Sequence, residues 1–130
     1  MRKIVLGLAL ALGLGACANI DNAYNTITGA TVSPAAVYIA RNSFDTLEVT
    51  STNYIRYCTA HRGAVGCNAT AIKQIIPAVR SGRVARNNLI QFQKDNPGAL
   101  GPTGLYNALV AATNTLSEVQ TQYNIGAVGK

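Results

Sequence analysis

Residues 68–98, NATAIKQIIPAVRSGRVARNNLIQFQKDNPG, decide the predicted fold. Apolar and small residues recur here at alternating spacings of four and three, the period of one face of an α-helix. The stretch therefore predicts a long amphipathic helix over about 68–95. Its predicted buried residues are Ala71, Ile75, Ala78, Gly82, Ala85, Leu89 and Phe92, and Ile72, Ile76, Val79 and Ile90 widen that face.

Residues at both ends of this segment, and one residue inside it, affect where the helix begins, ends or is interrupted. Cys67 or Asn68 can cap its start, and Asn96-Pro97-Gly98 ends it because a residue before proline avoids the helical region. Pro77 lies inside the helix, where proline costs about 3 kcal/mol. We therefore expect the helix to kink or restart there.

Two further helices flank this one. Ser33-Pro34 predicts the start of a helix over 34–60, with serine as the N-cap and proline at the first helical position. Gly101-Pro102-Thr103 opens a helix over about 103–123, which residues 124–126 end. The predicted buried residues are Val37, Ala40, Phe44, Leu47, Ser51, Tyr54 and Cys58 in the first helix, and Leu105, Leu109, Ala112, Leu116, Val119 and Tyr123 in the last.

The middle of the first helix carries a competing signal. Residues 49–52 include β-branched side chains that lower helix propensity, and Leu47, Val49, Ile55 and Tyr57 also fit the period of two of a strand. The helical spacing continues on both sides, so we prefer a helix. The fold class predicted for residues 33–126 is all-α, a small antiparallel three-helix bundle, with a C-terminal tail at 127–130.

Length and composition agree with one small folded domain. The chain has 130 residues, and domains usually run to about 100–150. It is 48% hydrophobic with no Trp and two Phe, so Ala, Leu, Val and Ile must build the core. Only 12% of residues are charged, which excludes a solvated disordered chain and a nucleic-acid-binding tail despite the net charge of +6.

Residues 1–16 have the layout of a secretory signal peptide. Arg2 and Lys3 form a positive start, residues 4–14 are apolar, and Gly15-Ala16 supplies small residues. The apolar run is shorter than the roughly 20 residues that a membrane-spanning helix needs. Residues 17–32 are rich in Asn, Thr and Gly and predict a flexible tether.

Leu14-Gly15-Ala16-Cys17 resembles the lipobox of bacterial lipoproteins, a resemblance confined to residues 1–18. It implies cleavage before Cys17, diacylglycerol on its thiol and acylation of the new amino group. The residue after this cysteine is Ala18. In bacterial lipoproteins an Asp at this position implies retention in the inner membrane, so the resemblance points to the periplasmic face of the outer membrane. Acyl chains would then hold the protein to the membrane. The alternative is ordinary cleavage after Ala18, since Ala16-Cys17-Ala18 also has the small-x-small form.

Three cysteines in an exported chain leave one unpaired, and lipidation of Cys17 would leave Cys58 and Cys67. We predict that these two form a disulfide, which stabilises the fold by about 2.7 kcal/mol in the chain-entropy model. One alternative is a zinc site at Cys58, His61 and Cys67, which lacks a fourth ligand. Another is a nucleophilic cysteine with His61 as its base. We expect no catalytic residue, cofactor or metal.

Two sets of charged residues are candidates for function. Asp45 and Glu48 share a helical turn that could serve acid–base chemistry, but Arg41, four residues before Asp45, predicts a plain surface ion pair. The second set is basic, and no acidic residue interrupts it. It is either a solvated helix face or a binding surface. As a binding surface it would take anionic lipid, an envelope polymer such as lipopolysaccharide, or an acidic protein. Nucleic acid is a disfavoured ligand because the protein is expected to be exported. The members of this basic set are Lys73, Arg80, Arg83, Arg86 and Lys94.

The third helix carries a single charge, Glu118. Interfaces are depleted in charged residues, so we hypothesise that this helix faces a partner protein or a second copy of the chain. Its predicted outer residues are Asn107, Asn114, Thr115, Ser117, Thr121 and Gln122.

Together these features predict a lipid-anchored cell-envelope protein with a non-catalytic binding or structural role. One alternative is an envelope enzyme or metal-binding protein that uses Cys58, His61 and Cys67. A second is a phage- or prophage-encoded envelope lipoprotein, to which no motif in the chain points.

Overall fold

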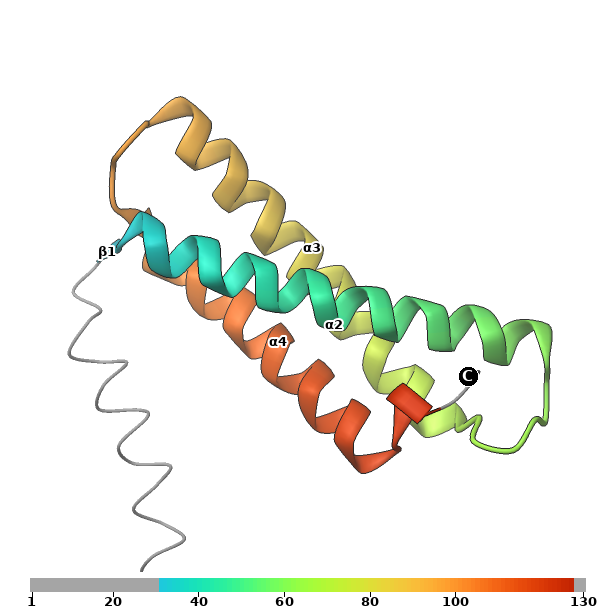
Figure 1. Ribbon diagram of the computed structural model, residues 1–130. Helices are drawn as coiled ribbons and strands as arrows, with labels where there is room; N and C mark the ends of the chain where they lie inside the picture. The colour runs from blue at the N-terminus through green and yellow to red at the C-terminus, as the bar shows by residue number, and fades with distance from the viewer. Residues whose placement is uncertain (1–30, 128–130) are drawn as a thin grey trace, which may run out of the picture.

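The computed structural model describes residues 31–127, and its three long helices confirm the predicted all-α fold. They are α2 (Pro34–Ala60), α3 (Ala69–Asp95) and α4 (Thr103–Gln122). Figure 1 shows them packed together, with the α2–α3 loop at one end of the bundle and the α3–α4 connection at the other. Over residues 31–127, no helix combines the length and hydropathy that crossing a membrane requires. The signal peptide at 1–16, Cys17, the tether up to residue 30 and the tail at 128–130 lie outside the described residues.

Side-chain caps explain where the first two helices begin. The Ser33 hydroxyl accepts a hydrogen bond from the Ala36 amide at 3.2 Å. The Asn68 side chain accepts from the amides of Thr70 and Ala71, at 2.8 and 3.1 Å. These bonds satisfy amides of the first helical turn that have no partner within the helix. Both starts agree with the sequence prediction.

Pro77 does not restart α3, which is one α-helix from Ala69 to Asp95. Of the two expected outcomes at this residue, a kink or a restart, the restart does not occur. Pro77 lies on the exposed side of the helix, while Ile75 and Ala78 beside it are buried. Packing of the buried face thus outweighs the local cost of the proline, because most helix stability in proteins comes from tertiary contacts.

A short strand pair closes the end of the bundle where the chain enters it. β1 (Thr31–Val32) pairs antiparallel with β2 (Gly101–Pro102), with Val32 opposite Gly101. Val32 is 1% exposed, so the chain joins the core before the predicted end of the tether at residue 32. At the other end of the chain, the 3₁₀ helix η1 (Ile125–Ala127) buries Ile125, a core residue that the sequence pattern did not indicate.

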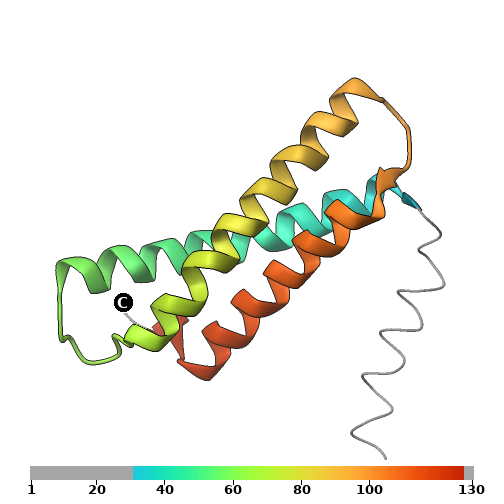
Figure 2. The same cartoon turned by 180° about the vertical axis from the view of Figure 1, so that it is seen from behind.

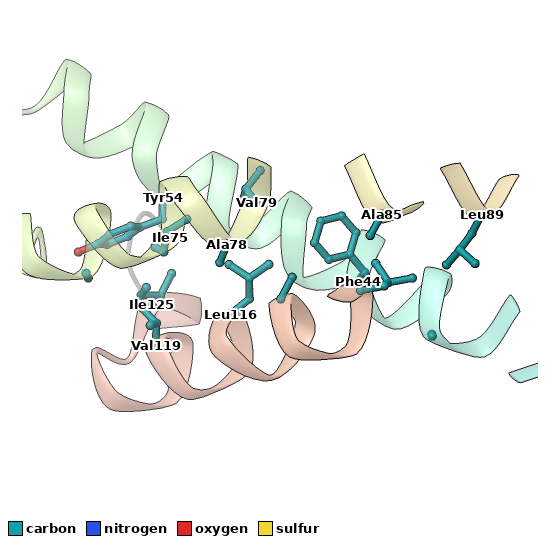
Figure 3. Close-up of a cluster of buried hydrophobic side chains, with 14 of the residues drawn as sticks. Phe44, Tyr54, Ile75, Ala78, Val79, Ala85, Leu89, Leu116, Val119 and Ile125 are labelled. Atoms are coloured by element: carbon teal, nitrogen blue, oxygen red, sulfur yellow. The ribbon is translucent and has the colours of Figure 1, made fainter. Parts of the chain in front are cut away.

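The core is a continuous cluster of aliphatic side chains around two aromatic rings, those of Phe44 and Tyr54 (Figure 3). Most of the predicted buried residues lie in it. In α2, however, Glu48 is buried and its neighbour Leu47 is only partly so. The other residues that were predicted as buried and are only partly buried are Ile72, Ile90, Phe92, Leu105 and Tyr123. Ile76, which the spacing also assigned to the buried face, is 42% exposed, so that prediction is wrong.

Figure 2 shows α2 crossing α3. The ring of Phe44 in α2 lies against Gly82 of α3. A Cβ atom at residue 82 would overlap this ring, so a glycine is needed for the helices to approach so closely. Phe44 itself is completely buried.

Candidate functional site

The disulfide predicted between Cys58 and Cys67 is present, and it joins the last turn of α2 to the residues just before α3. The two Cα atoms are 5.5 Å apart. Because both sulfurs are bonded to each other, neither is a thiolate that could attack a substrate or hold a metal. Among residues 31–127 there is also no group of three or more His, Cys, Asp or Glu side chains placed to bind a metal ion.

Tyr54 organises the loop that the disulfide closes. Its hydroxyl accepts a hydrogen bond from the Asn68 amide at 2.7 Å and donates one to the Gly66 carbonyl at 3.0 Å. The sequence placed Tyr54 in the buried stripe of the helix but gave no sign of this bond across the loop.

His61 stays next to its own helix rather than turning toward a reaction centre. Its ring stacks on that of Tyr57 with centroids 4.6 Å apart. Its Nδ1 atom lies 3.0 Å from the Tyr57 carbonyl oxygen. The side chain is exposed, and neither Cys58 nor Cys67 offers it a thiol to deprotonate.

The two acidic residues of α2 meet two of the predicted basic residues of α3. Arg86 donates from Nη1 to Asp45 at 2.6 Å and to Glu48 at 2.7 Å, and Arg83 pairs with the other oxygen of Glu48. The side chain of Glu48 is only 11% exposed. We call these four residues the α2–α3 ion cluster.

The environment of Arg86 stabilises its charged form. Its hydrogen bond to Asp45 raises the pKa of Arg86 above the ordinary value, with the charge of Glu48 adding to this and partial burial opposing it. Its guanidinium carbon also lies 5.7 Å from the centre of the Phe44 ring, within cation–π range. Arg86 therefore extends the contact at the crossing of α2 and α3.

The ion cluster corrects the expected pairing of Asp45. The sequence favoured Arg41, one helical turn away, but Asp45 binds Arg86 of the neighbouring helix. Arg41 donates instead to the Gln93 side chain at 3.1 Å. The packing of α2 against α3 determines the Asp45–Arg86 pairing, because it turns these two side chains toward each other.

The same cluster divides the predicted basic surface into two groups. Arg83 and Arg86 are bound to acidic residues of the domain. Lys73, Arg80 and Lys94 are exposed and form no ion pair within residues 31–127. The cations available to an outside ligand are therefore fewer than the sequence suggested.

Two grooves border the outer face of α3. The first, about 350 Å³, lies between α3 and α2 and is lined by Thr52, Ile55, Ile76, Val79, Arg80, Arg83 and Val84. The second, about 460 Å³, lies between α3 and α4 and is lined by Pro77, Arg80, Ser81, Val84, Ala85, Leu105 and Ala108. Arg80 and Val84 border both grooves. Most of the remaining lining is aliphatic, so both grooves are mainly apolar; Arg80 lines both of them, and Arg83 also lines the first.

The outer side of α4 is polar and carries one charge, that of the exposed Glu118. Its predicted outer residues are all exposed: Asn107, Asn114, Thr115, Ser117, Thr121 and Gln122. Gln120 turns inward instead, donating to the Leu47 carbonyl at 2.7 Å and lying 2.9 Å from the Ser51 hydroxyl.

Comparison with known proteins assigns neither a family nor a function. No protein-family model matches the chain, and no curated protein or solved structure is significantly similar to it.

Proposed function

We propose that this protein is a lipid-anchored component of the bacterial cell envelope, with a non-catalytic binding or structural role. The acyl chains would be attached at Cys17, and the helical domain would work at the periplasmic side of a membrane, more specifically the outer membrane. The proposal combines the lipobox-like segment, residues 14–17, with the chemistry of the folded domain.

The observation that carries the proposal is the Cys58–Cys67 disulfide. Structural disulfides persist in oxidising compartments such as the periplasm and are rare in the reducing cytosol. A bridge between these two residues leaves Cys17 as the odd cysteine of the chain, which is the residue that the lipobox resemblance marks for acylation.

The bridge also weakens the enzyme and metal-binding alternatives. Both require a thiolate at Cys58 or Cys67, and both sulfurs are bonded to each other. The other candidate pair, Asp45 and Glu48, is engaged by Arg83 and Arg86.

Intact mass of the protein extracted from membranes of a bacterial expression host tests the anchor. We expect a mature chain that begins at Cys17 and carries the mass of a diacylglycerol and a further acyl chain. Cys17→Ser is the matched control, and it should lack the added mass. A soluble chain that begins at Asn19 without added mass would overturn the proposal.

Thiol titration under native and denaturing conditions, without reductant, tests the non-catalytic role. We expect no free thiol in the acylated protein, since Cys17 carries lipid and the other two are bridged. Two free thiols in the mature domain would contradict the proposal and restore the enzyme and metal-binding alternatives.

A further inference from the structure

The outer face of α3 alternates cationic and aliphatic side chains. Lys73, Ile76, Arg80 and Val84 follow one another at spacings of three, four and four, so they lie on one side of the helix. We call them the α3 outer stripe. They lie opposite the buried face of α3, to which Ala71, Ile75 and Ala78 belong.

We infer that the α3 outer stripe docks on the surface of an anionic lipid bilayer. Lys73 and Arg80 would bind phosphate groups there, while Ile76 and Val84 would enter the layer beneath the headgroups. This inference names the partner of the envelope protein proposed above and rests on that proposal for the nearness of a membrane.

Exposure of the aliphatic members is the first support. Ile76 is 42% exposed and Val84 is 58% exposed. Both line the groove between α3 and α2, and Val84 also lines the groove between α3 and α4, so the apolar area extends on both sides of the stripe. Covering such a surface with lipid removes it from water, which is favourable.

Charge complementarity is the second support. The nearest acidic residues of α2, Asp45 and Glu48, are engaged by Arg83 and Arg86 and do not neutralise the stripe. Long basic side chains next to aliphatic ones suit a bilayer, because their charged ends reach the phosphates while the stems cover apolar surface. Each such residue near an anionic surface strengthens binding about fivefold.

These charges disfavour a second copy of the chain as the occupant. A symmetric dimer joins the same patch of both subunits. It would place Lys73 and Arg80 of one copy against those of the other, with no acidic residue of the stripe to separate them. An anionic bilayer has no such conflict.

The anchor at Cys17 would keep the stripe close to a bilayer. The chain from Cys17 to Val32 spans at most about 50 Å when fully extended, which is comparable to the thickness of one membrane. Docking then takes place at a high effective concentration, so weak contacts suffice.

Vesicle sedimentation of the unacylated mature chain, residues 18–130, tests the docking. This chain contains the whole described core, which extends from Val32 to Ile125, and its disulfide. We expect binding to vesicles of phosphatidylglycerol and phosphatidylcholine, weakening as salt is raised, and none to pure phosphatidylcholine. Acylation of Cys17 is tested separately, by intact mass. A negative vesicle experiment therefore counts against the docking and not against the lipid anchor, and a negative mass measurement counts against the anchor alone.

A charge-matched pair of variants locates the surface. Lys73→Gln with Arg80→Gln should weaken binding to the anionic vesicles about 25-fold. Arg56→Gln with Arg62→Gln removes the same charge from residues that line neither groove, and should weaken it about twofold. Equal losses in the two double variants would show attraction by net charge alone and would overturn the proposal.

A third variant tests the aliphatic members. Ile76→Gln with Val84→Gln keeps the charge and should weaken vesicle binding about tenfold. All variants should keep the circular dichroism and melting temperature of the parent, because the substituted residues are exposed. Unchanged vesicle binding by this third variant would overturn the inference. So would a parent protein that self-associates through the stripe and does not bind the vesicles.

Discussion

Helix α3 packs against α4 and against α2 through different kinds of side chains. Small residues from both helices, including Ala78, Ser81, Ala108 and Ala112, line the α3–α4 boundary. The two helices lie side by side along much of their length (Figures 1 and 2). Between α3 and α2 the connections include the Phe44–Gly82 contact, the α2–α3 ion cluster and the Arg41–Gln93 hydrogen bond, and the disulfide ties the end of α2 to the residues just before α3.

This difference shows how a chain with few aromatic residues can pack three helices. Small side chains let α3 and α4 approach along a continuous line, so many modest contacts share the stabilisation. α2 crosses α3, so their contact is concentrated at a few places. Single changes there should cost more than single changes between α3 and α4.

Removing the Phe44 ring should have the largest effect. Phe44→Ala should lower the free energy of unfolding by about 3–5 kcal/mol, because the ring is fully buried and leaves a cavity. Urea unfolding followed by circular dichroism measures this loss. A loss below about 1 kcal/mol would show that the crossing is not a main source of stability.

Gly82→Ala is the companion to that experiment. In the parent it should destabilise, because its Cβ atom overlaps the Phe44 ring. In Phe44→Ala the overlap is gone, and the same change should be neutral or stabilise by up to about 1 kcal/mol through helix propensity. Equal effects in both backgrounds would show that ring and glycine are not coupled.

Removing the disulfide should have the next largest effect. Cys58→Ala with Cys67→Ala should lower the free energy of unfolding by about 2–4 kcal/mol, because the bridge restricts the unfolded chain. Calorimetry with and without reductant measures it, since reductant should lower the melting temperature of the parent and leave the variant unchanged. An unchanged melting temperature in the variant would contradict a structural role for the bridge.

Crowding the α3–α4 boundary should cost less. Ala112→Leu should lower the free energy of unfolding by about 1–3 kcal/mol, because residue 112 is 4% exposed and a larger side chain there must displace its neighbours. Its neighbour Ala111 is exposed, so Ala111→Leu should stay within about 0.5 kcal/mol of the parent in the same denaturation experiment. Similar losses in both would mean that close packing does not hold this boundary.

Neutralising Glu48 should have a smaller effect. Glu48→Gln removes the charge that Arg83 and Arg86 share, and should cost about 1 kcal/mol, since solvent partly screens both arginines. Glu118→Gln, on the exposed side of α4, is the control and should change stability by less than about 0.5 kcal/mol. Thermal unfolding in low and high salt compares the two variants. Equal losses of stability in both would show that the ion cluster does not help to join α2 to α3.

Adding charge to the outer face of α4 should leave stability nearly unchanged. Asn114→Lys with Thr121→Lys changes only exposed residues and should shift the free energy of unfolding by less than about 0.5 kcal/mol. If this weakly charged face binds a partner or a second copy, the variant should lose association while it stays folded. Size-exclusion chromatography with light scattering measures self-association, and co-purification measures partner binding. If the variant changes neither of them, an interface on α4 has no support.

The helix limits could be predicted from the sequence because they depend on local chemistry. Ser33-Pro34, Asn68 and Asn96-Pro97-Gly98 act on neighbouring backbone groups, and the structure starts or ends helices beside them. The disulfide could also be predicted, since two cysteines remain once Cys17 is set apart. One helix over about 68–95 was also predicted, but whether Pro77 would restart it stayed open, because the packing that supports its continuity comes from other helices.

The candidate site was only partly predictable. The sequence placed Lys73 and Arg80 on one helical face, since helical periodicity determines which residues of one element share a side. It did not indicate that Arg83 and Arg86 would pair with α2, or that grooves would border Arg80 on both sides. The chain alone determined the helices, their buried faces and the cysteine pair. The tertiary structure alone decided which charges meet and which remain exposed, because that depends on how each helix is rotated against its neighbours, and many contacts distant in sequence set that rotation together.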